Sequence, residues 1–175
     1  MAAGKELQLV VVGAVPAAAL RELEASIQQV LTIGTYPGKV NLGTPTYAFN
    51  KDRNQYHTTA VMRRLLTIKD PGATHIMGVT DGDLFTPDTP FVFGEADRDS
   101  HVAVLSLFRI KGETETARRR IYVEAVHQAG HLVGLSYCED PRCIMSLATS
   151  LAEADRRQMQ LCNNCRNELV RIRRV

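Results

Sequence analysis

The chain has 175 residues, of which 45% are hydrophobic and 23% charged, so it is long enough for one domain with a sizeable core. A formal net charge of +2 is too small to indicate a nucleic-acid partner. No apolar run reaches the roughly 18 residues of a membrane span, so a membrane partner is not expected.

The N-terminal half alternates short apolar runs with amphipathic stretches. Residues 8–15 are rich in valine and bounded by Pro16, which predicts a buried strand. Glu6 and Pro16 argue against a signal peptide, so a cytoplasmic protein is expected. The further expected elements are a helix over 17–31, a strand over 32–36, a loop over 37–46, a helix over 55–68 and a strand over 74–80.

The C-terminal half is predicted to hold two strands followed by helices. The strands cover 91–93 and 101–110, with 94–100 as a link, and a helix runs over 115–133. Ser150-Leu-Ala-Glu153 is a capping box, which predicts a helix from Ser150 to the end of the chain. This order of elements predicts a single α/β domain.

A pair of histidines, His127 and His131, marks the predicted helix over 115–133. Four residues apart on a helix, they lie on one face one turn apart, as in the H-E-x-x-H helices of zinc proteases. Gly134 suits the end of the helix, and the chain then directs Tyr137 toward the same point. Two buried core histidines are the alternative, but the position of Gly134 and the cysteines nearby favour metal ligation.

Four cysteines form two closely spaced pairs, Cys138 with Cys143 and Cys162 with Cys165. In a reducing compartment this spacing indicates metal binding rather than disulfides. Four thiolates make a closed tetrahedral zinc site, which is a structural one. Four unrelated buried thiols are the weaker alternative, because no cysteine occurs elsewhere.

The combined pattern His-x3-His-x2-Gly-x3-Cys-x4-Cys-x-Met, followed by Cys-x2-Cys, resembles the archaemetzincins, zinc metallopeptidases of archaea with eukaryotic relatives. The resemblance covers residues 124–165 closely and extends to 91–94 and 103–107. It implies a catalytic zinc on the histidine helix, a structural zinc on the four cysteines, and Met145 in a turn beneath the catalytic metal. It also implies an edge strand that binds an extended peptide, formed by Phe91, Val92 and Phe93.

The expected fold is therefore one compact metzincin-like α/β domain over residues 1–175. A mixed twisted sheet with backing helices and the active-site helix would occupy 1–134. The turn with Met145, the four-cysteine zinc and the C-terminal helix would occupy 135–175, and the zinc would staple this part to the rest.

Two positions depart from the family pattern. Gln128 stands where the glutamate is expected, and loss of a general base typically costs about 10²–10⁴ in rate. Tyr137 stands where the third histidine is expected, and a neutral phenol with a pKa of about 10 is a poor zinc ligand. A second zinc at His127 and His131 is thus expected to be weakly held.

Other side chains are candidates to replace the missing base or ligand. Glu124 lies one turn before His127 on the same side, although a solvated residue or a salt-bridge partner of the arginines of 118–120 is the better-supported role. The remaining candidates are Glu95, Asp81 and Asp83 as bases, and His57, His75 and His101 as ligands. His101 stands out because it opens the strand that precedes the histidine helix.

These observations predict a monomeric archaemetzincin-type protein with reduced or no peptidase activity, whose cleft binds a peptide or protein segment. Two alternatives stay open. One is a slow zinc-dependent peptidase in which Gln128 positions water. The other is a purely structural zinc module without a peptide site.

Overall fold

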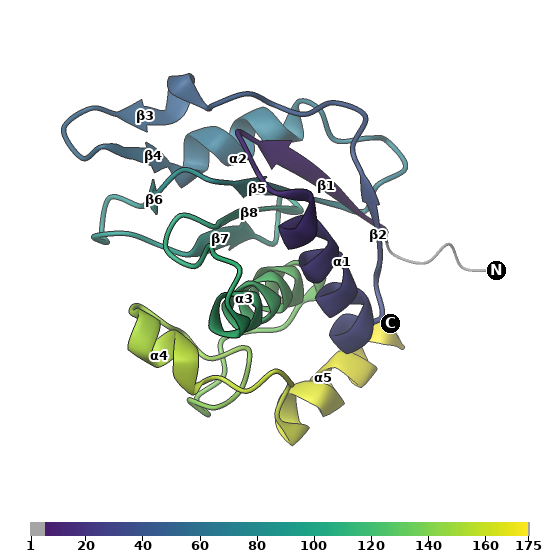
Figure 1. Cartoon of the computed structure of the whole chain (residues 1–175). Helices are drawn as coiled ribbons and strands as arrows, with labels where there is room; N and C mark the ends of the chain where they lie inside the picture. Colours follow the sequence, from purple (N-terminus) through teal and green to yellow (C-terminus); the bar gives the residue numbers. More distant parts are fainter. Residues whose placement is uncertain (1–5, 175) are drawn as a thin grey trace.

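A five-stranded mixed sheet forms the centre of the fold in a computed structural model that describes residues 6–174 (Figure 1). The ends of the predicted domain, 1–5 and 175, lie outside the described residues. The strand order is β2-β1-β5-β8-β7, in which only β7 runs antiparallel to its neighbour. The strands are β1 (Glu6–Val12), β2 (Gly34–Pro37), β5 (His75–Thr80), β7 (Gly94–Asp97) and β8 (Val102–Ser106).

Helices cover both faces of this sheet. The helices α1 (Ala17–Leu31) and α3 (Glu115–Val133) pack together on one face, and α2 (Thr58–Leu66) packs against β5 and β8 on the other. Because both faces are covered, β5 and β8 are buried along their whole length. The apolar stripe of α1 holds Leu23, Ile27 and Leu31 in the larger core cluster, as its periodicity predicts.

The predicted bounds of α1 and α3 are confirmed, and the prediction of a helix over 55–68 is partly wrong. Residues 55–57 form strand β4 (Gln55–His57), and helix α2 begins only at Thr58. The strand β4 belongs to a small second sheet with β3 (Phe49–Asn50) and β6 (Leu84–Phe85), next to a single 3₁₀ turn, η1 (Thr46–Ala48). Its parallel partner β6 lies far away in sequence, so no local pattern marks it.

The edge strand of the large sheet lies later in the sequence than predicted. It is β7, within the segment that was expected to be a link, and it pairs with β8 from Gly94↔Leu105 to Asp97↔Val102. Residues 91–93 precede it and make only an isolated antiparallel bridge, Leu84↔Val92. Three aromatic and β-branched residues favour a strand locally, but the partner β8 ends at Ser106, so the ladder starts at Gly94.

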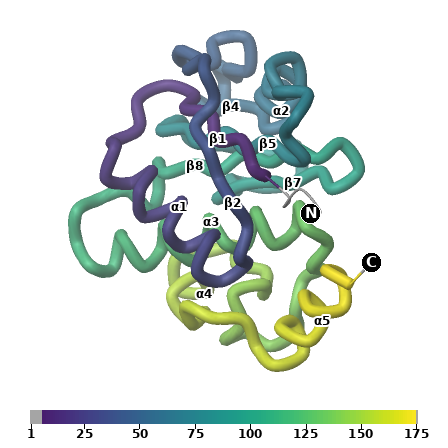
Figure 2. Tube along the Cα trace, turned by 90° about the vertical axis from the view of Figure 1, so that its right-hand side faces the viewer, coloured from purple at the N-terminus to yellow at the C-terminus, as the bar shows by residue number. Residues whose placement is uncertain are grey.

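The C-terminal part is two helices rather than the single helix that was expected. They are α4 (Leu151–Arg156) and α5 (Asn163–Arg173), and they lie on the side of α3 that faces away from the sheet (Figures 1 and 2). The Ser150 side chain caps α4 by accepting the N–H of Glu153 at 3.2 Å, as predicted. The Glu153 carboxylate instead accepts the N–H of Thr149, and the helix stops where the Arg157 backbone turns extended. No helix of the described chain is long and apolar enough to cross a membrane.

Candidate metal centres and cleft

Helix α3 places both histidines of the motif on one face. It begins at Thr114, whose hydroxyl accepts the N–H of Ala117 at 3.1 Å, and it ends at Gly134 with φ of +120°. Glycine tolerates this positive φ because it has no Cβ, so the predicted helix end at Gly134 is confirmed. The chain then turns back, which brings Tyr137 next to the histidines.

The two imidazoles have the arrangement that a zinc ion requires. The Nδ1 atom of His127 lies 2.8 Å from the carbonyl oxygen of Ile144, and that of His131 lies 2.9 Å from the carbonyl oxygen of Leu135. A carbonyl can only accept, so each Nδ1 carries the proton and each Nε2 offers a lone pair. The two Nε2 atoms lie 3.1 Å apart. Two nitrogens on a tetrahedral zinc are about 3.3 Å apart, so the pair fits this metal.

Tyr137 completes the cluster, but as a weak donor. Its ring centroid lies 4.5 Å from that of His131 and 5.7 Å from that of His127, and the side chain is 61% exposed. Burial, followed by the charges of Glu124 and Glu95, raises the pKa of the phenol. A neutral hydroxyl therefore faces the histidines at neutral pH, and it competes poorly for zinc.

Both histidines are neutral at pH 7, which favours metal binding. Burial, opposed in part by Glu124, lowers the pKa of His127. Burial, and then His127, lower the pKa of His131 to about 4. Neither imidazole must lose a proton before it binds a metal near neutral pH.

Gln128 is held by a buried ion pair. Its Nε2 donates to Glu124 Oε1 at 2.8 Å, and Arg157 donates to Glu124 Oε2 at 2.8 Å. All three side chains are at most 4% exposed. Burial alone would raise the pKa of Glu124, but Arg157 and His127 outweigh it and lower this pKa. Glu124 is thus an ionised partner of Arg157 and not a free base.

Met145 packs against α3 at Gly130, the residue before His131. Its side chain is fully buried, and a Cβ added at Gly130, between the two histidines on α3, would come within 2.6 Å of Met145 Sδ. A side chain at position 130 would therefore displace the Met145 side chain from its present place. This packing agrees with the floor role that the family resemblance implies for Met145.

A cleft of about 780 Å³ opens beside the histidines. One wall comes from residues 91–99, which include β7, and the other from α3 with Tyr137, residues 147–149 and Arg157. The aromatic rings of Phe91 and Phe93 lie 5.2 Å apart at its border, and Phe91 also packs under the guanidinium of Arg109. All three residues of 91–93 thus line the cleft although they do not form the edge strand.

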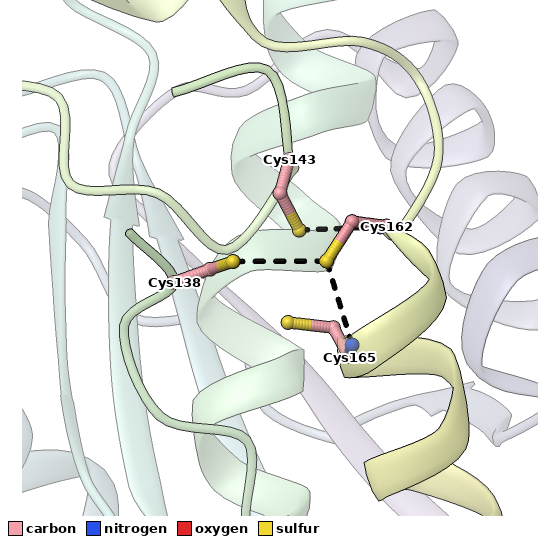
Figure 3. Close-up of side chains that lie close together, drawn as sticks. All are labelled: Cys138, Cys143, Cys162 and Cys165. Carbon is pink, nitrogen blue, oxygen red and sulfur yellow. Dashed lines mark hydrogen bonds between the residues drawn. The ribbon is translucent and has the colours of Figure 1, made fainter. Parts of the chain in front are cut away.

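The four cysteines meet on the far side of α3 from the sheet (Figure 3). Cys138 and Cys143 come from the loop after α3, Cys162 caps α5, and Cys165 lies in its first turn. The four Sγ atoms lie within 4.8 Å of one another, and those of Cys138 and Cys162 are 3.7 Å apart. Two sulfurs on a tetrahedral zinc are about 3.8 Å apart, whereas a disulfide bond is about 2.0 Å, so the cluster fits a metal.

The pKa values of the thiols also favour a metal ion in this cluster. Burial raises the pKa of Cys143 to about 11 and raises that of Cys165 as well. Burial also acts against ionisation of Cys162, but hydrogen bonds from the backbone N–H of Cys165, in the first turn of α5, and from the neighbouring thiols outweigh burial and lower the pKa of Cys162. One thiolate forms readily while its neighbours need a cation to ionise, and a bound zinc supplies that charge.

Most of the other candidates lie outside the cleft. His57 caps α2 by accepting the N–H of Thr59 at 3.1 Å, and His101 packs against His75 with centroids 5.1 Å apart. Asp81 accepts the N–H of Ala14, and Asp83 pairs with Arg109 at 2.9 Å. Of the side chains considered as replacements, only Glu95 and Glu124 line the cleft.

Two arginines that line the cleft could not be identified as site residues from the sequence. Arg157 belongs to a charged run and looks solvated, yet it is 2% exposed and 3.4 Å from His127 Nδ1. Arg98, in the turn between β7 and β8, donates to the carbonyl oxygens of His131 at 3.2 Å and Leu135 at 2.9 Å. Both roles depend on contacts between segments more than 30 residues apart.

The central sheet, the histidine helix and the cysteine cluster together define a metzincin-type zinc metallopeptidase. The sequence profile of peptidase family M54 matches residues 11–171, and the chain belongs to this family, the archaemetzincins. The archaemetzincin of Methanocaldococcus jannaschii is 33% identical over 132 residues, which cover 71% of this chain and 72% of that protein.

Solved structures agree with this assignment. The crystal structure of archaemetzincin from Methanopyrus kandleri superposes with a TM-score of 0.88 and 30% identity, over 98% of this chain and 97% of that one. A zinc-dependent peptidase from Methanocorpusculum labreanum superposes with a TM-score of 0.80 and 29% identity, over 93% of this chain and 99% of that one. The predicted family and fold class are therefore confirmed, and zinc is the metal that the family and the cysteine cluster support.

Proposed function

We propose that this family member binds a peptide or protein segment in its cleft and hydrolyses it slowly or not at all. One observation carries the proposal. The side chain next to His127 in α3 is Gln128, and the carboxylate that Gln128 contacts, Glu124, is paired with Arg157. An amide has no basic oxygen at neutral pH, so neither Gln128 nor the paired Glu124 is a free base for a water molecule at His127 and His131.

The proposed zinc arrangement is one tightly held structural ion and one weakly held ion. Cys138, Cys143, Cys162 and Cys165 would hold the first. His127 and His131, with Tyr137 as a poor third donor and Met145 beneath, would hold the second. A zinc bound there would supply Lewis-acid polarisation of a carbonyl group. Near it, Gln128 Oε1 can accept a hydrogen bond and so orient a water molecule or an amide.

The cleft supports binding of an extended segment. The strand β7 has no strand partner on the side away from β8 within residues 6–174, so its backbone groups are available for strand addition. Phe91, Val92 and Phe93 supply apolar contacts at one end of the same wall. A segment bound along β7 would pass directly beside the two histidines.

A slow, genuine peptidase is the second candidate. The converging Nε2 atoms, 3.1 Å apart, and the two Nδ1 hydrogen bonds that orient the rings favour it. Turnover that depends on added zinc would support this candidate. Absence of binding by any peptide would instead leave a purely structural zinc module.

The decisive experiment restores both missing groups, with Gln128→Glu and Tyr137→His in one protein. We expect peptidase activity to rise at least about 10²-fold over the unchanged chain, because a base and a third imidazole return together. The control is Gln28→Glu, which adds the same carboxylate on an exposed position of α1. A double variant that binds two zinc ions per chain and still cleaves no peptide contradicts the proposal.

The proposal includes a cytoplasmic monomer that acts on protein segments rather than nucleic acid or membranes. A net charge of +2 gives no basic surface strong enough for nucleic acid. Light scattering on a sizing column would give a mass near 19.4 kDa for a monomer, whereas a doubled mass would contradict the monomer.

A further inference from the structure

A tight turn joins β7 to β8 and presents one arginine, Arg98, to the end of α3. The turn is well defined, because Asp97 Oδ1 accepts the backbone N–H groups of Asp99 at 3.1 Å and Ser100 at 3.3 Å. His101 closes the turn with a left-handed φ of +60°, and its N–H donates to the carbonyl oxygen of Arg98 at 3.3 Å. These contacts fix the backbone of Arg98 at the border of the cleft.

The guanidinium of Arg98 spans two carbonyl groups at the C-terminal end of α3. Its Nε donates to the carbonyl oxygen of His131 at 3.2 Å, and one Nη donates to that of Leu135 at 2.9 Å. Although Asp97 and Asp99 flank Arg98 in sequence, it forms no ion pair with either of them within residues 6–174. The last carbonyl groups of a helix lack partners within the helix and carry partial negative charge, so they attract the guanidinium.

The carbonyl oxygen of Leu135 connects Arg98 to the histidine cluster. The same oxygen accepts the Nδ1–H of His131 at 2.9 Å. A carbonyl oxygen has two lone pairs, so Arg98 and His131 together use both of them. The N–H of Leu135 donates to the carbonyl oxygen of Gly130 at 2.9 Å, so both backbone polar groups of Leu135 are paired. Leu135 thus holds the ring of His131 and the start of the segment that leads to Tyr137.

The two histidines differ in how well their carbonyl acceptors are protected from water. A neutral imidazole carries its proton on one of two nitrogens, and only the other nitrogen offers a lone pair to a metal. A carbonyl acceptor at Nδ1 keeps the proton there and leaves Nε2 free. The hydrogen bond from His127 to Ile144 is buried, whereas the one from His131 to Leu135 is only partly buried. The carbonyl group of Leu135 therefore needs a second donor to hold its orientation against water.

We infer that Arg98 is a positioning residue of the histidine metal site, which acts through the Leu135 carbonyl group to fix the orientation and the protonated nitrogen of His131. This inference rests on the second metal site of the proposed function and adds a residue to it. Without Arg98, water would compete for the Leu135 carbonyl group and the Nδ1 proton would lose its fixed acceptor. The tautomer with the proton on Nε2 would then gain population, and it has no lone pair at Nε2 for a zinc ion.

The chemical shifts of the imidazole nitrogens, measured by NMR at neutral pH, report the tautomer without a metal in the histidine site. The full chain receives a single equivalent of zinc, which the cysteine cluster takes, and the signals of His131 are assigned by their absence from His131→Gln. We expect the unchanged chain to carry the His131 proton on Nδ1. In Arg98→Met the population with the proton on Nε2 should rise at least about threefold.

The zinc affinity of the histidine site gives the second measurement, by competition with a chromogenic chelator once the cysteine cluster is filled. Arg98→Met should weaken this binding roughly three- to tenfold, which is less than the loss of a direct partner of a metal-bound histidine. Arg98→Lys should recover only part of the affinity, because an ammonium keeps the charge but cannot span two carbonyl groups as a planar fork does. The control Arg63→Met removes an exposed arginine of α2, on the opposite face of the sheet from α3, and should change neither measurement.

A role of Arg98 in stabilising the end of α3 alone predicts a different result. Arg98→Met would then lower the melting temperature but leave the His131 tautomer and the zinc affinity of the folded protein unchanged, and this outcome would overturn the inference. A shifted tautomer together with weaker zinc binding in the folded variant supports it. If the unchanged chain binds no zinc at the histidines, the proposed second metal site fails, while the His131 tautomer still decides the role of Arg98.

Discussion

The cysteine cluster and the histidine cluster both lie next to α3, yet they differ in how completely they could surround a metal ion. The cysteine cluster has four donors of one kind, with Cys143 and Cys165 buried and all Sγ atoms within 4.8 Å. The histidine cluster has two well-oriented imidazoles, an exposed phenol and an open cleft. The cysteine cluster can surround a zinc ion without water. The histidine cluster offers too few strong donors for a zinc ion and has Gln128 in the place of a general base.

The geometry of a peptidase site is preserved here although two of the expected side chains, a glutamate and a histidine, are replaced by Gln128 and Tyr137. Gly130, Met145 and the two Nδ1 hydrogen bonds preserve the positions of the rings. These contacts also pack the core, so they stabilise the fold independently of any reaction. The missing carboxylate and imidazole serve only the reaction.

The largest effect is expected from Cys143→Ser. Loss of one buried thiolate should release the structural zinc and destabilise the chain by more than ~5 kcal/mol, since zinc binding acts as folding energy at such sites. Thermal unfolding with metal analysis measures it, and His131→Ala is the matched change in the other cluster. Equal falls in melting temperature for the two variants would contradict the distinction between the clusters.

Breaking the buried ion pair under the histidines should have the next largest effect. Glu124→Gln leaves the guanidinium of Arg157 buried without its carboxylate, which typically costs about 3–5 kcal/mol. Urea unfolding measures the loss. Arg171→Ala in the exposed Arg171–Glu168 pair is the control and should leave the midpoint unchanged, while an equally harmless Glu124→Gln would show that Arg157 finds another partner.

The metal-free chain should lose stability as the pH falls from 6.5 to 4. The pKa of His131 is lowered from 6.5 to about 4, and that of His127 is lowered too, so the unfolded chain binds more protons across this window. The free energy of unfolding should drop by about 2–3 kcal/mol for His131 alone. Urea titrations at pH 7 and pH 4.5 would show a smaller drop in the free energy of unfolding for His131→Gln than for the unchanged chain. An equal drop in both proteins would contradict a lowered pKa of His131.

Tyr137→His should change stability least but the metal affinity of the cleft most. The side chain is 61% exposed, so the metal-free chain should change by less than about 1 kcal/mol. A third imidazole should tighten zinc binding at the cleft at least about tenfold, as measured by competition with a chromogenic chelator. The neighbouring exposed Ser136→His serves as the control, and equal gains in both variants would show that Tyr137 is not the ligand position.

Local patterns predicted much of this molecule. The helix bounds at 17–31 and 115–133, the cap at Ser150 and the helix end at Gly134 each depend on residues within a few positions of one another. The spacing of two histidines and two cysteine pairs depends on the same short-range geometry. These features could be predicted because the physical cause lies within a single element.

The rest could not be predicted, because it depends on pairing between distant segments. The edge strand begins at Gly94 since β8 offers partners only there, although residues 91–93 look more strand-like. The single predicted C-terminal helix breaks because Arg157 leaves the helix to reach Glu124. Buried charge gives no periodic signal in sequence.

The sequence by itself determined the family, the fold class and the candidate donors of both clusters, since residue type and short spacing decide which atoms can bind zinc. Only the tertiary structure decided which of these donors are free to act. Glu124, a candidate base from the sequence, is paired with Arg157, and Gln128 Oε1 has no hydrogen-bond partner among the described residues. Whether a side chain is available depends on its partners, and its partners come from across the fold.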